Sequence, residues 1–515
     1  MRPDETSSTA APWISDKLFL QCCCLLAFAL ALAVVWKNTF LPMQDLPQHL
    51  FMAWVANNYE VEALKLAEIY ELRGQLGPYR ITYLLQRLFS TFLDPLTAAK
   101  LVVTLYLLTV ALLVLKIQSE VEGVAPAWAS VLLIPASFHP MYFYGFMSFT
   151  LAVPVLVLLL LDLRALLLSG NTKAPVFIHC VLVAVLFLIH PYTLLVYLVL
   201  ATVTTMLLAR NRQALYRGVI AIVFGGLIFL LWMLVSAGTK SLTTLDEARL
   251  VWWPLQLNVR FLEVMFSGLR MPGTDNWQIP LLWLSIGLLL IIGSWSRKLE
   301  AGRGLWLGLL AMIALLGFFL LPFSVQTQER FTFFSVRLAP ISLLLLLAAF
   351  SLLHLHVLAG RAVAVAGVLM TFLIAQTHDR VAKEVEYIAP LISKMQAGGK
   401  VLPLISNSRS AFLDPGFYAQ FHYHDVFYYH LLKGGGANPD LFGNRLMPVV
   451  YQSGQRPSRP SQRELYRWPK YAPGYDYIIS RSIDPRIELE LERNLPKIER
   501  SGSWRLYRVP AKSVH

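Results

Sequence analysis

The chain has 515 residues, of which 56% are hydrophobic and only 15% are charged. Its mean hydropathy of +0.56 corresponds to more apolar surface than a water-soluble domain can bury, so the composition excludes an ordinary soluble protein and indicates a bilayer as the solvent. The net charge of +13 does not point to nucleic acid, because a basic excess in a membrane protein more often sets its orientation. The four cysteines form no CxxC pair, which argues against redox and zinc-thiolate chemistry.

Apolar segments recur along the chain as far as residue 377, and we interpret eleven of them as membrane spans. No small-residue cleavage site follows the first segment, so we expect it to be an anchor and not a removed signal peptide. The expected spans are residues 16–36, 98–116, 125–139, 145–163, 174–190, 192–209, 217–236, 280–296, 304–322, 334–357 and 362–377.

The basic residues between these spans predict the orientation of the protein. If the N-terminus is cytoplasmic, the inner ends and loops collect most of the lysines and arginines, and the short outer loops carry only Arg330. This distribution follows the positive-inside rule. It predicts a multi-pass protein of a bacterial inner (plasma) membrane, with the N-terminus in the cytoplasm and the C-terminal region in the periplasm or outside the cell.

The run "ITYLLQRLFSTFL" at residues 81–93 is the ambiguous segment of this topology. Counting it as a span would turn most of the basic residues outward, against the positive-inside rule. We therefore expect an amphipathic helix at the outer membrane surface, with Arg80 and Arg87 at the level of the lipid headgroups.

The predicted fold is a polytopic α-helical membrane protein of about 11 transmembrane helices, with amphipathic helices on its outer face and a small C-terminal α/β domain. The transmembrane domain covers residues 1–377, with a first outer loop at 37–97 and a second at 237–279. Residues 378–515 form the extracytoplasmic α/β domain. Its expected elements, in order, are a helix at 380–395, a strand at "KVLPLIS", a helix around "FYAQFHYHDVFYYHLL", a strand at "YDYIIS", a helix at 485–495 and a strand at "WRLYRV".

The stretch "LPMQDLPQHL" places Asp45 and His49 one helical turn apart at the edge of the first span. Asp45 and Gln48 match a helix-capping box, and Pro47 suits a first helical turn, so capping alone can explain Asp45. The functional interpretation is compatible with it, because a capping carboxylate is held rigid and ionised, as a general base or metal ligand requires. The apolar stripe of the expected surface helix consists of Leu46, Leu50, Phe51, Trp54 and Val55.

Two further patterns lie at the outer ends of predicted spans. In "FHPMYFYGF" and "LIHPYTL", His139, Tyr142 and His190 sit where an apolar run meets the headgroups. They serve either as interfacial anchors or as the lining of an outward-facing pocket that binds a phosphate or a sugar. By contrast, His422 and His424 in "FHYHD" are interpreted as solvated residues of the polar tail.

The segment "FSVQTQERFTFFSVRLAPISLLL" carries Arg330 in a loop and Arg337 about two helical turns later, within an apolar run. An arginine at that depth is destabilising by a few kcal/mol unless it has a partner, which makes it a functional hypothesis. An anionic lipid headgroup would supply the partner. Snorkelling, or an internal pair with Glu329, is the competing interpretation.

This arrangement resembles the GT-C superfamily of membrane glycosyltransferases. The resemblance covers nearly the whole chain, although each motif is short. It implies a polyprenyl-phosphate-linked sugar donor, transfer on the outer face to a glycan, lipid or protein acceptor, and inversion at the anomeric carbon. The residues that carry it are "LPMQDLPQHLFMA", "GPYRITYLLQRLF", "FYGFMSFTLAVPV", "ERFTFFSVRLAPISL", "YDYIIS" and "WRLYRV".

By the same resemblance, Asp45 would be the catalytic carboxylate, with His49 beside it, and Arg330 or Arg337 would hold the lipid phosphate. The remaining candidates for substrate binding are His139, Tyr142, His190 and Glu329. Asp45 would either activate the acceptor or coordinate a divalent cation such as Mg²⁺ or Mn²⁺, and the cofactor stays open because the chain lacks the adjacent acidic pair that is common in the first outer loop of the family.

Two other classes of function remain open at this point. The protein could be a carrier or flippase for a lipid or solute, in which His139, His190 and Arg337 line a path, or an assembly protein whose tail recruits envelope partners. The sequence contains no P-loop, GxSxG or glycine-rich dinucleotide motif, so nucleotide-driven chemistry has no support.

Overall fold

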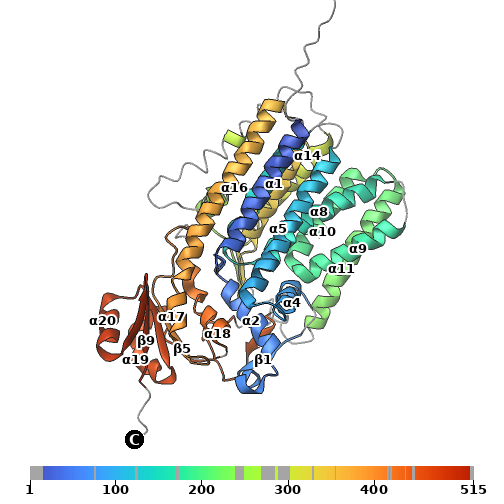
Figure 1. Cartoon of the computed structure of the whole chain (residues 1–515). Coiled ribbons are helices and arrows are strands. Elements are labelled where there is room, and N and C mark those ends of the chain that lie inside the picture. Colours follow the sequence, from blue (N-terminus) through green and yellow to red (C-terminus); the bar gives the residue numbers. More distant parts are fainter. Residues whose placement is uncertain are drawn as a thin grey trace, which may run out of the picture.

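The structure is a computed structural model in which a bundle of helices carries the first long loop and the C-terminal strands at one end (Figure 1). The model describes residues 15–74, 77–121, 126–169, 173–237, 249–267, 285–287, 302–326, 330–353, 355–413, 417, 420–434, 436–442 and 447–510.

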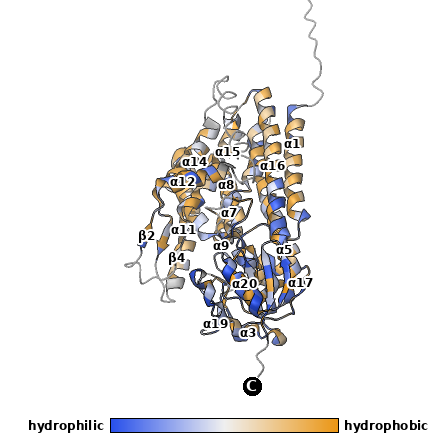
Figure 2. Ribbon diagram, turned by 90° about the vertical axis from the view of Figure 1, so that its left-hand side faces the viewer, coloured by the Kyte–Doolittle hydropathy of each residue, from blue (hydrophilic) through white to orange (hydrophobic). Residues whose placement is uncertain are grey.

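Nine long helices build the bundle within these residues, and Figure 2 shows that they are mostly hydrophobic. Six of the described helices are long and apolar enough to cross a membrane, and three shorter ones are also apolar. The bundle helices are α1 (Asp16–Lys37), α5 (Pro95–Glu120), α8 (Met147–Leu168), α9 (Lys173–Ile189), α10 (Pro191–Leu208), α11 (Arg212–Ala237), α14 (Gly302–Leu320), α15 (Leu338–Ser351) and α16 (Val357–Glu386).

Most of the expected spans coincide with these helices, but the segment at 125–139 does not form one continuous helix. It contains a 3-10 helix, η2 (Trp128–Leu132), and a single turn, α6 (Leu133–Ala136), followed by α7 (Pro140–Phe143). Pro126, Pro135 and Pro140 lack the amide hydrogen that a continuous helix needs, which accounts for the interruptions. The expected span at 280–296 lies almost entirely outside the described residues.

The last bundle helix differs from the expected boundary at residue 378. α16 runs on to Glu386 without a break, so it extends directly from the bundle into the C-terminal region. There Glu384 is contacted by Ser410 Oγ at 2.6 Å, His422 Nε2 at 3.3 Å and Arg481 Nη2 at 3.4 Å. This buried ion-pair network joins the end of the helix to the C-terminal sheet.

The C-terminal sheet has the strand order β5-β7-β9-β8. β5 and β7 are parallel, with Val401 opposite Tyr477, and the other neighbours are antiparallel. β5, β7 and β9 coincide with the three expected strands, whereas the edge strand β8 was not expected. The elements of this region are α17 (Ala389–Ser393), β5 (Val401–Ile405), η5 (Phe421–His424), α18 (Phe427–Lys433), β6 (Val449–Tyr451), η6 (Gln462–Arg467), α19 (Trp468–Tyr471), η7 (Ala472–Gly474), β7 (Tyr477–Arg481), α20 (Pro485–Asn494), β8 (Lys497–Ser501) and β9 (Trp504–Arg508).

The first long loop is packed into the protein and does not simply rest on its surface. α2 (Leu46–Asn58), which we expected to lie on the membrane, is buried along most of its length between α4, α5 and α18. A short antiparallel pair of β1 (Tyr70–Leu72) with β6 ties the same loop to the C-terminal region. The apolar stripe of α2 therefore faces protein instead of lipid. Its partners α18 and β6 are distant in sequence, so the helical pattern of α2 alone could not predict this.

The segment at 81–93 forms α4 (Arg80–Phe89), which is too short to span a bilayer. Leu84 and Leu88 on its outer side are 40% and 56% exposed, whereas Arg80 is only 8% exposed. The short elements not yet named are η1 (Glu62–Leu64), α3 (Leu66–Ile69), β2 (Arg249–Val251), α12 (Leu255–Ser267), β3 (Ser324–Gln326), β4 (Arg330–Phe331) and η4 (Ser335–Arg337).

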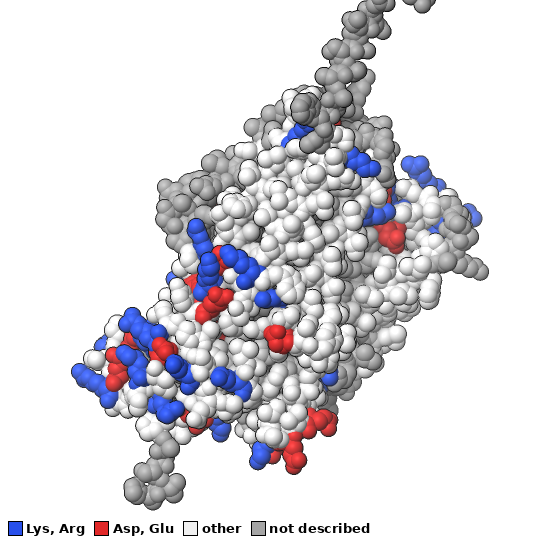
Figure 3. Space-filling view, viewed as in Figure 1, with Lys and Arg blue, Asp and Glu red and all other residues white. Residues whose placement is uncertain are grey.

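Charged side chains gather at the end of the molecule that carries the C-terminal sheet, as the space-filling view in Figure 3 shows. On the same face, the helical bundle is largely bare of charge over its middle part. Such a band fits the hydrocarbon core of a bilayer, in which charged groups are rare. The C-terminal sheet, α2 and α4 lie together at one end of the bundle, beyond this band (Figure 1).

Close packing of α16 on η2 yields a first prediction. A Cβ atom added at Gly360 would lie 2.2 Å from the ring of Trp128, whereas one added at Gly308 of α14 would meet nothing within 4 Å. Gly360→Ala should therefore destabilise the protein by about 1–3 kcal/mol through overpacking. The measurement is the thermal unfolding midpoint in detergent, with Gly308→Ala as the control. Equal midpoints for the two variants would contradict the packing described here.

Candidate functional site

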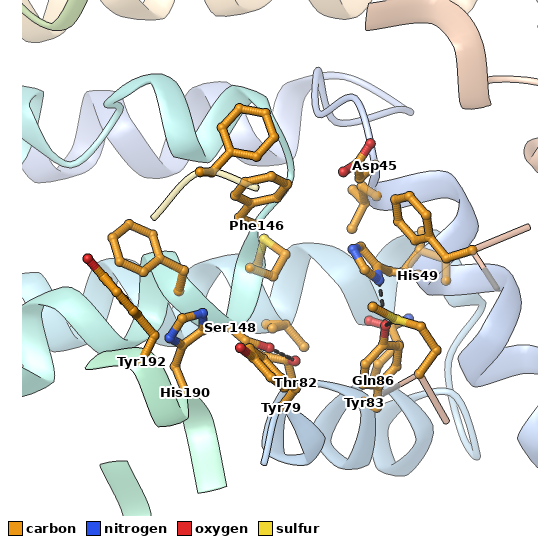
Figure 4. Close-up of a pocket in the computed structure, with 18 of the residues that line it drawn as sticks. Asp45, His49, Tyr79, Thr82, Tyr83, Gln86, Phe146, Ser148, His190 and Tyr192 are labelled. Carbon is orange, nitrogen blue, oxygen red and sulfur yellow. Dashed lines mark hydrogen bonds between the residues drawn. The ribbon is translucent and has the colours of Figure 1, made fainter. Parts of the chain in front are cut away.

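A cavity of about 370 Å³ lies at the end of the bundle between the first loop, the starts of α8 and α10, and the segment before α15. Figure 4 shows Asp45 and His49 at one end of it and His190 and Tyr192 at the other. Its lining residues are Asp45, Leu46, His49, Leu50, Tyr79, Thr82, Tyr83, Gln86, Ala99, Val102, Phe146, Met147, Ser148, Phe149, His190, Tyr192, Thr332, Phe333, Phe334, Arg337, Phe442 and Met447.

Asp45 occupies the N-cap position of α2, but its side chain makes no capping hydrogen bond. The capping box expected with Gln48 is therefore absent, because the Gln48 amide oxygen instead accepts a hydrogen bond from the Phe442 backbone at 3.2 Å. The Asp45 carboxylate accepts a hydrogen bond from Gln44 Nε2 at 3.3 Å and lies 3.5 Å from His424 Nε2. Asp45 is thus free of structural capping and lines the cavity.

Burial changes the acidity of this carboxyl group. The desolvation of Asp45 raises its pKa from 3.8 to about 7, and the hydrogen bond from Gln44 opposes the shift. The capping amides that the sequence predicts would lower the pKa and keep Asp45 ionised. The structure shows burial without such capping, so the pKa is raised instead. A carboxyl group with a pKa near neutrality is suited to accept a proton from a substrate and release it again.

The backbone around Asp45 is held against the segment that precedes α8. Gln44 N donates to Phe143 O at 2.8 Å, and Asp45 N donates to Tyr144 O at 3.1 Å. Gly145, which follows Tyr144, has a φ of +80°. A Cβ atom there would lie 2.9 Å from Leu46 N and 3.0 Å from Asp45 N. Only glycine permits this close approach together with this backbone conformation.

His49 lies one turn after Asp45 and also lines the cavity. Its Nδ1 and the hydroxyl of Tyr83 are 2.5 Å apart, a contact that Figure 4 marks with a dashed line. Burial lowers the pKa of His49 to about 4, so its imidazole is neutral at physiological pH. His49 can therefore exchange hydrogen bonds with a bound hydroxyl without adding charge beside Asp45.

Arg337 closes the other end of the cavity. Its guanidinium lies 5.3 Å from the ring centre of Phe146 and 5.9 Å from those of Phe149 and Tyr192. Its buried Nε atom has no hydrogen-bond partner among the described residues. A cation that is held by aromatic faces and retains an unused donor can bind an anion that enters the cavity.

His190 stands beside this arginine as the N-cap of α10. Its Nδ1 accepts a hydrogen bond from Thr193 N at 3.3 Å, which fixes the ring and leaves Nε2 for other partners. Tyr79 packs edge-on against His190, with 4.8 Å between ring centres. Tyr192 OH is already engaged, because it donates to Phe334 O at 2.7 Å.

Two of the residues proposed from the sequence do not line this cavity, and the side chains of two others are not described. His139 is buried but is not among the residues that line it. Tyr142 is also buried, with its hydroxyl 2.9 Å from His378 Nε2. Glu329 lies outside the described residues, and for Arg330 only the backbone position in β4 is described. Asp45, His49, His190 and Arg337 are the proposed residues that share the cavity.

Several cavity residues carried no signal in the sequence. Thr82 and Ser148 face each other across the wall, with their hydroxyl oxygens 2.6 Å apart. Phe442 and Met447 come from the C-terminal region, which the sequence treats as a separate domain. His424, interpreted as solvated, is buried against Asp45.

The residues around Asp45 do not fit a resident Mg²⁺ or Mn²⁺ ion. In the part of the chain that the structure describes, no group of three His, Cys, Asp or Glu side chains converges on a metal position. The neighbours of Asp45 are an amide and an imidazole, whereas Mg²⁺ prefers an octahedron of oxygen ligands. We therefore assign no chemical step to a metal ion.

The approach of Gly145 to Asp45 can be tested by its effect on stability. Gly145→Ala adds the strain of a positive φ, about 1–2 kcal/mol, to a clash with the backbone of Asp45. Gly454→Ala is the matched control, because Gly454 has a φ of +78° and open space around its Cβ. We expect Gly145→Ala to lower the thermal midpoint clearly more than Gly454→Ala. Indistinguishable midpoints would mean that the loop tolerates a Cβ at this position.

No protein-family model and no curated protein sequence matches the chain significantly. Among solved structures, the chain is similar to ArnT from Cupriavidus metallidurans, determined bound to undecaprenyl phosphate. The TM-score is 0.54 at 11% identity, over 96% of this chain and 98% of that one. It is also similar to the arabinofuranosyltransferase AftD from Mycobacteria, with a TM-score of 0.48 at 13% identity over 97% of this chain and 40% of that one.

ArnT belongs to the GT-C superfamily. The similarity to ArnT extends over nearly all of both chains, so it concerns the complete architecture and not one helical bundle. The resemblance inferred from the sequence is therefore confirmed at the level of the fold alone: this chain has the fold of ArnT.

Proposed function

We propose that the protein is an integral membrane glycosyltransferase that moves a sugar from a polyprenyl-phosphate-linked donor to a glycan, lipid or protein acceptor on the outer face of the membrane. The observation that carries this proposal is the shared cavity, in which the titratable carboxyl group of Asp45 and the guanidinium of Arg337 face one space. The binding of undecaprenyl phosphate by ArnT, a structural neighbour, supports a donor of this chemical class.

In the proposed reaction, a hydroxyl oxygen of the acceptor attacks the anomeric carbon of the donor sugar. The proton of that hydroxyl passes to the carboxylate of Asp45, which acts as a general base. The bond between the anomeric carbon and the phosphate oxygen breaks, and its electron pair leaves with the phosphate. Attack from the side opposite the leaving group inverts the configuration at the anomeric carbon.

Arg337 has the complementary role at the other end of the cavity. Negative charge grows on the phosphate as the bond breaks, and a fixed guanidinium in an apolar wall stabilises that charge better than water does. The aromatic rings of Phe146, Phe149 and Tyr192 hold the guanidinium in place without neutralising it. The donor's polyprenyl chain would remain among the apolar helices while its headgroup enters the cavity.

The proposal predicts that Asp45→Asn reduces sugar transfer by at least about 100-fold, because an amide cannot accept the proton. The wild-type turnover should rise as the pH increases through about 7, since only the ionised form of Asp45 acts as a base. Both effects are measured on purified protein with a polyprenyl-phosphate sugar and an acceptor.

The control for this variant is Asp484→Asn, which makes the same chemical change at another position, the N-cap of α20. Asparagine caps a helix as well as aspartate does. Asp484→Asn should retain the wild-type turnover and pH profile. Wild-type turnover in Asp45→Asn would remove Asp45 from the mechanism.

A second prediction concerns the donor. Arg337→Gln should weaken binding of the polyprenyl-phosphate donor by roughly tenfold or more, because a charge-assisted hydrogen bond to phosphate is lost. Binding of the acceptor should change little. Titration of both substrates on Arg337→Gln and on the charge-conserving Arg337→Lys distinguishes the two effects, and an unaltered donor affinity in Arg337→Gln would overturn the assignment.

A carrier or flippase would use the same cavity as part of a path. Sealed vesicles separate this class from the transferase, because a carrier accumulates or reorients its substrate without covalent change. Recovery of the lipid donor with its sugar still attached, on the other side of the vesicle membrane, would favour the carrier.

A further inference from the structure

α4 has a second polar face that points away from the cavity. Thr82 and Gln86 face the cavity, whereas Arg80, Leu84 and Arg87 follow each other at intervals of four and three residues on another side of the helix. That side borders a separate small hollow of about 20 Å³. The hollow is lined by Met52, Ala53, Ala56, Leu72, Arg73, Gly74, Arg80, Tyr83, Leu84, Arg87 and Pro448.

Arg80 is the unexplained residue of this hollow. Arg80 is only 8% exposed. Its Nε and Nη1 atoms are buried without a hydrogen-bond partner among the described residues. A buried guanidinium without an acceptor is strongly unfavourable. Two nitrogen atoms of this positively charged group are therefore unused hydrogen-bond donors within the described fold.

Two further arginines border the same hollow. Arg87 donates through Nε to Asn57 Oδ1 at 2.9 Å, which fixes its position beside the hollow. Arg73 is paired with Glu71 at 3.2 Å, in an exposed contact that contributes little stability. Among the residues that the structure describes, three arginines and no carboxylate line the hollow.

The surroundings indicate the type of anion. Leu84 lies between Arg80 and Arg87 along the helix and is 40% exposed, and Leu88 beyond it is 56% exposed. α4 lies at the end of the apolar bundle, where headgroups of a bilayer would be (Figure 1). An anion with an attached acyl chain satisfies both features, because the chain covers the leucines while the anion meets the arginines.

We infer that Arg80, with Arg87 and Arg73, forms a binding site for the phosphate of an anionic membrane lipid, separate from the cavity that contains Asp45. The hollow has room for one oxygen atom of the phosphate, which accepts hydrogen bonds from Arg80, and the remaining headgroup stays at the mouth. Tyr83 borders both spaces, so the lipid would pack against the residue that contacts His49.

The experiment uses full-length protein that has been depleted of lipid in detergent. Dihexanoyl phosphatidylglycerol is titrated while the thermal unfolding midpoint is followed, with dihexanoyl phosphatidylcholine and inorganic phosphate as parallel arms. We expect phosphatidylglycerol to raise the midpoint more than either of them. Arg80→Gln should require roughly tenfold more phosphatidylglycerol for half of the rise.

Two control variants locate the effect. Arg463→Gln removes an exposed arginine of η6 that borders neither space, and it should respond as the wild type does. Arg337→Gln should also keep the response, because its arginine belongs to the other cavity. If Arg80→Gln does not fold, Arg87→Gln and Arg80→Lys carry the test, with a reduced and a partly retained response.

Three results would overturn the inference. An unchanged dose in the Arg80 and Arg87 variants would show that these arginines bind no lipid. An equal rise with inorganic phosphate would mean that the site takes free phosphate and not a lipid. An equal rise with phosphatidylcholine would show apolar adsorption without recognition of charge. None of these results bears on sugar transfer by Asp45.

Discussion

The contact between two backbone segments is the constraint on which the candidate site depends. Gln44 and Asp45 donate their amide hydrogens to the carbonyls of residues 143 and 144, and Gly145 lets the chains approach to van der Waals distance. Because both segments are short turns between helices, their own sequences do not fix where they lie. Paired with each other, they hold the first residues of α2 and of α8 on opposite walls of one cavity. The carboxyl group of Asp45 is thereby removed from water, which is why its pKa rises to about 7.

The C-terminal region completes the site at the end of the helical bundle. His424 lies 3.5 Å from Asp45, and Phe442 contributes to the cavity wall. These contacts exist because α16 continues out of the bundle and carries the sheet on Glu384, and because β1 pairs with β6. The region that looks like an appended domain in the sequence is therefore part of the wall around the candidate catalytic residue. Its removal would expose Asp45 to water and remove the cause of its raised pKa.

Two arginines at this end of the molecule face two separate spaces. Arg337 faces the larger cavity and is held by aromatic rings, whereas Arg80 faces a separate hollow beside exposed leucines of α4. Both have buried nitrogen atoms without partners among the described residues. In the function proposed above, Arg337 binds the phosphate of the reacting substrate and Arg80 binds that of a surrounding lipid. α4, with a different polar face toward each, separates the two.

The sequence by itself determined the class of the protein, because 56% hydrophobic residues and repeated long apolar runs leave a bilayer as the only suitable solvent. It also proposed Asp45, His49, His190 and Arg337 as candidates, since polar groups at the ends of apolar segments are unfavourable there without a function. The tertiary structure alone decided which of them share a cavity. Helical and alternating periodicity reports which side of an element is apolar, but not whether that side meets lipid or protein, so α2 was expected on the surface and is buried. The neighbours of Asp45 include Tyr144 and His424, which are 99 and 379 residues away, and only the folded chain brings them together.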